Sequence, residues 1–283
     1  MPQNCSSDIE AVITHLDRMY AVNDTAGIQA LKETFGLGSL VHVDDFAAAI
    51  QINLFAWQNL APYAGSGFYG FCDALEVKDG VNAGPQGWGL ENAIYSWGKF
   101  WTTEWYDFYC NAQDAETCLG TYNTSQSHWT NVAVSNANRS WFWMVCNQLG
   151  FYQVGPPEDQ PSIVSRILQP IYHERQCVNM FPQAFASPPE PTTAETNKMY
   201  AGWDVDIPRL FFANGLRDPW REATVSADGL KKPNTTSMPI YESDAFHCTD
   251  MITQSDIDPS VVVVQKAALM YMKEWLAEWK PSA

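Results

Sequence analysis

Two apolar runs near the C-terminus, each ending at a polar loop, place the strongest restriction on how this chain can fold. The first run, residues 209–213, leads to Asp218, and the second, residues 238–243, leads to His247. A long amphipathic segment begins at Asp258-Pro259, where the proline suits a first helical position. Strand, loop, strand, loop and helix in this order indicate an α/β fold, in which the carboxyl ends of neighbouring strands meet at one edge of the sheet.

An aspartate and a histidine brought to one sheet edge can act together in acid–base catalysis. In a serine hydrolase the buried carboxylate fixes the tautomer of the imidazole, whose other nitrogen takes the serine proton. An α/β-hydrolase presents these residues in the order nucleophile, acid, histidine, which makes Asp218 and His247 the candidate catalytic residues. Spacing alone leaves open that Asp218-Pro219 is an ordinary turn and that His247 is a surface or core histidine.

The composition is that of an acidic globular protein. Of the 283 residues, 46% are hydrophobic and 17% are charged, and the net charge of −16 argues against binding nucleic acid. No run of about 20 apolar residues suits a membrane span. We therefore expect no nucleic-acid or membrane partner. The strong acidity favours a secreted or vacuolar/lysosomal protein that works at low pH.

Seven cysteines and five glycosylation sequons support an oxidising compartment. The sequons begin at Asn4, Asn23, Asn123, Asn138 and Asn234. Cys110 and Cys118 are close enough in sequence to close a small loop, and the odd count leaves a thiol that is free or bonded outside the chain. No cysteine pair has zinc-site spacing, and the sequence calls for no metal ion or cofactor. A cytosolic protein with buried thiols is the alternative.

The first half of the chain predicts consecutive helices. A capping box at residues 7–10 predicts the first helix, and helical spacing of apolar residues predicts others near 28–35, 44–60 and 90–105. Residues 62–89 are rich in glycine, which predicts loops. We therefore expect residues 1–135 to form a helical domain.

From about residue 136 the pattern changes to an alternation of strands and helices. The aromatic and apolar run 141–146 predicts a strand, residues 162–172 predict a helix, and the proline-rich stretch 182–191 predicts a linker. Together with the two runs described first, residues 136–283 are expected to form an α/β domain.

Three segments resemble the serine peptidase family that includes lysosomal Pro-Xaa carboxypeptidase, dipeptidyl peptidase II and fungal secreted prolyl peptidases. Asn214-Gly215-Leu216-Arg217-Asp218-Pro219-Trp220 is similar to the family's N-G-x-x-D-P-W segment, which carries the triad aspartate. His247-Cys248-Thr249-Asp250 is similar to its histidine segment, with Cys248 where the lysosomal members have a second histidine. Residues 141–151 resemble its W-x-x-Q-x-C-T-E-x-G-x-x segment, with Met144 and Asn147-Gln148 as departures.

The resemblance implies the C-terminal portion of an α/β-hydrolase fold over residues 136–283, with residues 1–135 as its helical cap insertion. It implies a serine peptidase whose peptide substrate has proline near the cleaved bond and whose triad contains Asp218 and His247. Whether such an enzyme acts as a carboxypeptidase, a dipeptidyl peptidase or an endopeptidase stays open, as does a homodimer.

The resemblance also suggests two structural details. It implies a disulfide between Cys146 and Cys177, while Cys5 and Cys72 stay unassigned. It places Trp220 in an apolar pocket that takes proline, since the flat proline ring stacks well on an indole. A position for Trp220 in the hydrophobic core, without a role in substrate binding, is an equally supported alternative.

The family's nucleophile is missing from the sequence. No G-x-S-x-G elbow occurs, and the nearest stretches, Gly65-Ser66-Gly67 and Gly36-Leu37-Gly38-Ser39, lie among predicted helices and loops. The first residues, Met1-Pro2-Gln3-Asn4-Cys5, do not form a signal peptide. We therefore expect the chain to be the C-terminal part of a longer protein whose serine lies upstream of Met1, and we expect this fragment alone to be inactive.

Two other functions stay open. A truncated or inactive pseudoenzyme would keep the fold without the serine. A carbohydrate-active secreted enzyme would suit the 12 tryptophans and the excess of carboxylates. Against the second, the nearest acidic pair, Asp204-Val205-Asp206, precedes Pro208 instead of following a strand.

Overall fold

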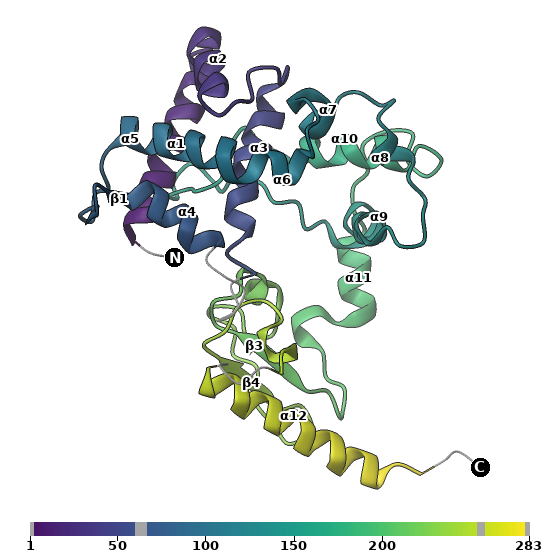
Figure 1. Ribbon diagram of the computed structural model, residues 1–283. Coiled ribbons are helices and arrows are strands. Elements are labelled where there is room, and N and C mark those ends of the chain that lie inside the picture. The colour runs from purple at the N-terminus through teal and green to yellow at the C-terminus, as the bar shows by residue number, and fades with distance from the viewer. Residues whose placement is uncertain (1–2, 60–66, 254–257, 281–283) are drawn as a thin grey trace. The chain divides into compact units, whose positions relative to one another are not determined.

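The computed structural model describes residues 3–59, 67–253 and 258–280, and the chain divides into two compact units. One unit, here called the helical unit, comprises Met1–Leu54 and Tyr69–Thr196. The other, here called the strand unit, comprises Phe55–Phe68 and Asn197–Ala283 and contains a pair of parallel strands (Figure 1). The protein is thus rich in helix and has few strands among its described residues.

The helical unit consists of helices with short joints. In chain order these are α1 Gln3–Ala21, α2 Thr25–Thr34, α3 Val43–Phe55, α4 Gly67–Glu76, α5 Leu90–Phe100, α6 Tyr106–Cys110, α7 Ala115–Leu119, α8 Ser127–Thr130, α9 Ala137–Met144, α10 Pro170–Met180 and α11 Thr193–Tyr200, which runs into the strand unit. The π-helical turns η1 Trp101–Trp105 and η2 Val145–Leu149 continue α5 and α9. A short antiparallel hairpin pairs β1 Val77–Lys78 with β2 Val81–Asn82.

Buried aromatic side chains form the core of the helical unit. Phe35 contacts the rings of Phe46 and Trp97 at centroid distances of 5.6 and 5.8 Å, and Phe71 contacts Trp97 at 5.3 Å. The indole N–H of Trp97 donates to Asn53 Oδ1 at 2.9 Å, so this buried polar group is paired. Burial of one such side chain contributes about 1.5–3 kcal/mol, which makes the cluster a main tie between α2, α3, α4 and α5.

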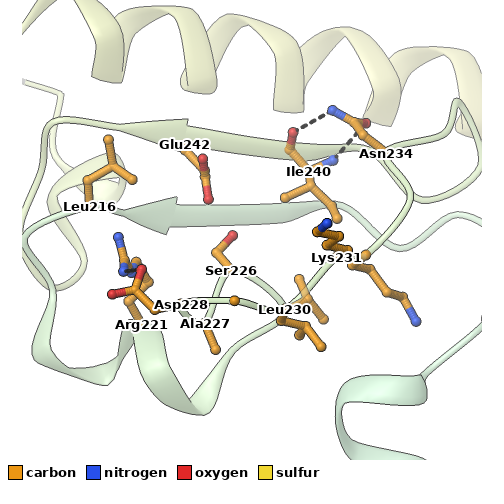
Figure 2. Close-up of a pocket in the computed structure, with 13 residues that line it drawn as sticks. Leu216, Arg221, Ser226, Ala227, Asp228, Leu230, Lys231, Asn234, Ile240 and Glu242 are labelled. Carbon is orange, nitrogen blue, oxygen red and sulfur yellow. Dashed lines mark hydrogen bonds and ion pairs between the residues drawn. The ribbon is translucent and has the colours of Figure 1, made fainter.

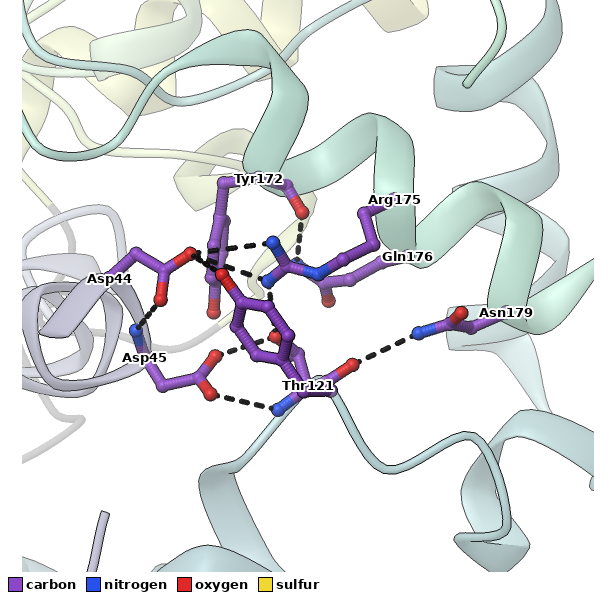
Figure 3. Close-up of polar contacts among 8 residues, drawn as sticks. Asp44, Asp45, Thr121, Tyr172, Arg175, Gln176 and Asn179 are labelled. Atoms are coloured by element: carbon purple, nitrogen blue, oxygen red, sulfur yellow. Dashed lines mark hydrogen bonds and ion pairs between the residues drawn. The ribbon is translucent and has the colours of Figure 1, made fainter. Parts of the chain in front are cut away.

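A polar network joins the start of α3 to α10 (Figure 3). The buried Asp45 carboxylate accepts hydrogen bonds from the backbone N–H and the hydroxyl of Thr121, at 3.1 and 2.6 Å. Arg175 donates to the Thr121 hydroxyl at 2.8 Å and pairs with Asp44, with 3.4 Å between Nη1 and Oδ2. Burial raises the pKa of Asp45, and the Thr121 hydrogen bonds oppose that shift. The network therefore fixes the segment after α7 between two helices.

Three disulfides stabilise the described part of the helical unit. They join Cys5 to Cys72, Cys110 to Cys118 and Cys146 to Cys177, with Cα–Cα distances of 5.3, 5.4 and 5.8 Å. The first pair, unassigned from sequence, ties α1 to α4, and the second closes the small loop that the spacing predicted. The third is the pair that the family resemblance implied, and it joins η2 to α10.

The run 141–146, predicted as a strand, is helical, and this prediction was wrong. Asn136 caps α9, and its side chain accepts a hydrogen bond from the Arg139 N–H at 3.1 Å. Trp143 then packs against Phe181 and Phe185 at 5.1 and 5.6 Å. A short aromatic run does not by itself distinguish strand from helix, and here the capping residue and the packing of Trp143 favour the helix.

Other local expectations also need correction. The helix α1 begins at Gln3, so Ser7 lies inside it and not at its cap. Helix α4 occupies part of the glycine-rich stretch predicted as loop, and the helix expected over 162–172 begins only at Pro170. Helices also continue past residue 136, and the two compact units divide at 196/197 in this part of the chain.

The strand unit contains the two strands that the sequence placed before Asp218 and His247. Strand β3 Phe212–Gly215 pairs in parallel with β4 Ile240–Ser243. The 3-10 turns are η3 Gly202–Asp204, η4 Pro219–Ala223 and η5 Thr249–Met251, and the closing helix is α12 Pro259–Glu278. Asp258 caps α12 and accepts from the Ser260 N–H at 2.8 Å, as the sequence predicted for this start. Helix α12 lies along β4 in Figure 1 and buries Val261 and Val264.

The outer edge of β4 is covered by a side chain. In the parallel register the backbone of Pro239, Tyr241 and Ser243 faces β3, so the backbone of Ile240 faces away. Asn234 fills that side: its Nδ2 donates to the Ile240 carbonyl at 2.8 Å, and its Oδ1 accepts from the Ile240 N–H at 3.1 Å (Figure 2). The amide thus takes the place of a further strand at this point of the edge.

Candidate active site

Strand β3 carries Asp218 into a tight turn. The Asp218 N–H donates to the Gly215 carbonyl at 3.1 Å, and Pro219 then opens the 3-10 turn η4. Asp218 caps this turn, because its Oδ1 accepts the backbone N–H of Trp220 at 2.9 Å. One carboxylate oxygen is therefore held by the main chain, which leaves Oδ2 to face another partner.

Strand β4 carries His247 into the neighbouring loop. The pairing of the strands continues past their ends, since the Arg217 N–H donates to the Ala245 carbonyl at 2.9 Å. A side chain at Gly215 would clash there, because a Cβ would lie 2.4 Å from the same carbonyl oxygen. The close approach that this glycine permits brings the two loops side by side.

The loops meet in a hydrogen bond between the two candidate residues. His247 Nδ1 lies 2.8 Å from Asp218 Oδ2, and the two side chains are 40% and 14% exposed. With Asp218 ionised, Nδ1 is the donor and Nε2 carries the lone pair of the neutral ring. The arrangement can hold one tautomer of an accessible imidazole, which is what a general base requires.

Two residues that the sequence gave no reason to select support these loops. The Gln58 carbonyl accepts the His247 backbone N–H at 3.1 Å, and Gln58 Oε1 accepts the Trp220 indole N–H at 2.7 Å. The Trp57 indole donates to the Arg217 carbonyl at 2.9 Å. Both residues follow α3 in the chain, and no local pattern indicates that this segment reaches the loops of Asp218 and His247.

Trp220 lies near the histidine as well as beside the aspartate. Its ring centroid is 6.3 Å from that of His247, at an interplanar angle of 45°. The side chain is half-buried, so it is neither a fully enclosed core tryptophan nor an exposed one. Its indole N–H donates to Gln58 Oε1, so the polar atom of this half-buried side chain has a partner.

The arginines beside this site are already engaged with carboxylates. Arg217 binds Asp244 through two contacts of 2.5 Å, and Arg221 binds Asp228 and Glu222. Binding of a peptide carboxylate by either arginine would have to compete with these pairs.

Cys248, adjacent to His247, has the surroundings of an unreactive thiol. The residue is exposed and not disulfide-bonded. Partial desolvation of its thiol, followed by the negative charges of Asp250 and Asp218, raises its pKa. A raised pKa lowers the thiolate population, which argues against a cysteine nucleophile. Of the serines considered from sequence, Ser39 follows α2 in the helical unit, and Ser66 lies outside the described residues.

The sequons differ in accessibility. Asn23, Asn123, Asn138 and Asn234 are exposed, and Asn4 is half-buried with its amide donating to the Ala83 carbonyl at 3.3 Å.

Across residues 3–59, 67–253 and 258–280, no group of three or more acidic, histidine or cysteine side chains is arranged to hold a metal ion. In the same residues, no helix combines the length and apolar character needed to span a membrane.

Comparison with known proteins identifies the class. The family described as serine carboxypeptidase S28 matches residues 3–269, so this chain belongs to that family of serine peptidases, which have an α/β-hydrolase-type fold. The resemblance that the Asp218 and His247 segments suggested is thereby confirmed at the level of the family.

The similarity to two fungal relatives extends over nearly the whole chain, and that to a plant relative over less than half of it. Serine protease vicPb of Bipolaris victoriae is 27% identical over 300 residues, which cover 99% of this chain and 56% of that protein. A probable extracellular serine carboxypeptidase of Arthroderma benhamiae is 27% identical over 309 residues, covering 97% and 42%. A probable serine protease EDA2 of Arabidopsis thaliana is 30% identical over 128 residues, covering 45% and 24%. The chain spans about half the length of the first of these relatives.

Proposed function

We propose that this chain supplies the acid and the base of a Ser-His-Asp triad in a proline-directed serine peptidase. The observation that carries the proposal is the 2.8 Å contact between His247 Nδ1 and Asp218 Oδ2, with Asp218 Oδ1 held by the Trp220 N–H. His247 takes the serine proton through Nε2 and returns it to the leaving amine, while Asp218 stabilises the imidazolium that forms in between.

The serine in this proposal comes from a G-x-S-x-G elbow outside the 283 residues. Support comes from the absence of that motif here and from the greater length of the relatives. In this proposal residues 1–135 form the helical cap insertion, and residues 136–283, which include β3 and β4, form the C-terminal part of a larger α/β-hydrolase domain. A two-stranded parallel sheet is rarely stable alone, which favours further strands beside β3.

The substrate in this proposal is a peptide with proline next to the cleaved bond. The ring of Trp220, half-buried and 6.3 Å from the His247 ring, is suited to contact a proline beside the reacting atoms.

Secretion, or delivery to a vacuole or lysosome, would suit the disulfides and the exposed sequons. An inactive pseudoenzyme is the second candidate, favoured by the missing elbow.

A fluorophosphonate probe separates these candidates. The protein would be purified from cells that produce it with an antibody against this chain, labelled, and digested for mass spectrometry; the recombinant 283-residue chain would be labelled in parallel. We expect the label on a serine in a G-x-S-x-G peptide of the purified protein and none on the recombinant chain. Labelling of the recombinant chain would place the nucleophile within it, and a purified protein without label would indicate the pseudoenzyme.

A further inference from the structure

The residue Gln58 contacts both loops of the candidate catalytic pair. Through its main chain it accepts the His247 N–H at 3.1 Å, and through its side chain it accepts the Trp220 indole N–H at 2.7 Å. Trp220 in turn donates its own backbone N–H to Asp218. One residue is therefore connected to the histidine loop and, through Trp220, to the aspartate.

Trp57 repeats this double attachment. Its indole N–H donates to the Arg217 carbonyl at 2.9 Å, directly before Asp218. Its ring packs edge-on against Phe246, directly before His247, at a centroid distance of 5.1 Å and an angle of 79°. The dipeptide thus makes two contacts to each loop.

From these contacts we propose that Trp57-Gln58 is a positioning pair that sets the distance between Asp218 and His247. The proposal rests on the proposed function, since it assigns a purpose to that pair. His247 is 40% exposed, and water competes for a hydrogen bond at such a position, so the bond contributes little by itself. Neighbouring residues must therefore hold Asp218 and His247 at this distance. The hydrogen bond from the Arg217 N–H to the Ala245 carbonyl joins the two loops directly, and Trp57-Gln58 contacts both of them as well.

Nuclear magnetic resonance of the full 283-residue chain tests this inference without requiring a substrate. With nitrogen-15 in the histidine and tryptophan side chains, two quantities are measured near pH 8: the ratio of Nδ1–H to Nε2–H tautomers of His247, and the exchange rate of the Trp220 indole N–H. Gln58→Met removes the acceptor at nearly constant length, and Gln58→Glu keeps an acceptor oxygen. Asn234→Leu is the matched control, since it removes two hydrogen bonds from the same unit at Ile240.

In the wild type we expect the Nδ1–H tautomer to predominate. Gln58→Met should shift the tautomer ratio toward Nε2–H about three- to tenfold and speed exchange of the Trp220 indole N–H by a similar factor, as expected for the loss of one hydrogen bond. Gln58→Glu should retain the wild-type values, and Asn234→Leu should leave both quantities unchanged. If Gln58→Met does not fold, Trp57→Phe serves instead. It keeps an aromatic ring beside Phe246, removes the hydrogen bond to the Arg217 carbonyl and should shift the tautomer ratio of His247 in the same direction.

Two results would overturn the positioning proposal alone. One is faster exchange at Trp220 with an unchanged His247 ratio, which would make Gln58 only a support for the indole. The other is an equal shift in Asn234→Leu, which would reflect general loosening of the unit. A wild type without a preference for the Nδ1–H tautomer would instead contradict the Asp218–His247 pair, and with it the proposed function.

Discussion

Replacing Glu76 by glutamine should make the helical unit more stable at neutral pH and leave its stability near pH 5 almost unchanged. Asp8 on α1 and Glu76 on α4 are only 1% and 6% exposed, and the charge of the Asp8 carboxyl acts on that of Glu76. Within the described residues no ion pair involves either group. Burial, followed by the neighbouring Asp8, raises the pKa of Glu76 from 4.5 to about 7.

The direction of the pH effect follows from this shift. A carboxyl whose pKa is higher in the folded than in the unfolded state binds its proton more tightly when folded, so stability falls as the pH rises from about 4.5 to about 7. At ~1.4 kcal/mol for each pKa unit, ionised Glu76 costs the folded state about 3 kcal/mol, of which about 2–3 kcal/mol is lost between pH 5 and pH 8. Glutamine resembles the protonated acid at every pH and avoids this loss.

The assay is urea unfolding at a series of pH values, followed by far-ultraviolet circular dichroism. We expect the free energy of unfolding of Glu76→Gln to exceed that of the wild type by an amount that grows by about 2–3 kcal/mol from pH 5 to pH 8. Comparing variant and wild type at each pH removes the contribution of other titrating groups. Glu158→Gln, on an exposed loop, is the control and should show a constant difference near zero. A Glu76→Gln difference that does not change with pH would refute the reasoning from the raised pKa of Glu76.

Three further changes test other parts of the structure. Asp218→Asn in the serine-containing protein should lower turnover of a prolyl peptide about 10⁴-fold by favouring the wrong His247 tautomer, and a loss below about tenfold would argue against the triad. Phe35→Ala should cost about 3–5 kcal/mol in urea unfolding, since a fully buried ring between Phe46 and Trp97 is removed, and a cost below about 1 kcal/mol would contradict that packing. Replacing Cys5 and Cys72 together by alanine should cost about 4 kcal/mol for a loop of 67 residues, and an unchanged urea midpoint would show that this bridge is unimportant.

Much of the strand unit was predictable because its signals are local. The apolar runs before Asp218 and His247, and the Asp258-Pro259 start of α12, each act within a few residues of the chain. In the helical unit, α2, α3 and α5 likewise followed from apolar spacing. Membership of the serine carboxypeptidase S28 family also followed from short segments.

The sequence by itself therefore determined the order of the strands, the aspartate and the histidine, whereas the tertiary structure decided how they are held. The run 141–146 became helix because Asn136 caps it and Trp143 finds Phe181 to pack against. Gln58 was not recognisable, since the bond from its side chain to Trp220 crosses 162 residues and no local pattern encodes such a contact. Caps and turns depend on backbone groups a few residues apart, but a contact between distant segments exists only once packing has brought them together.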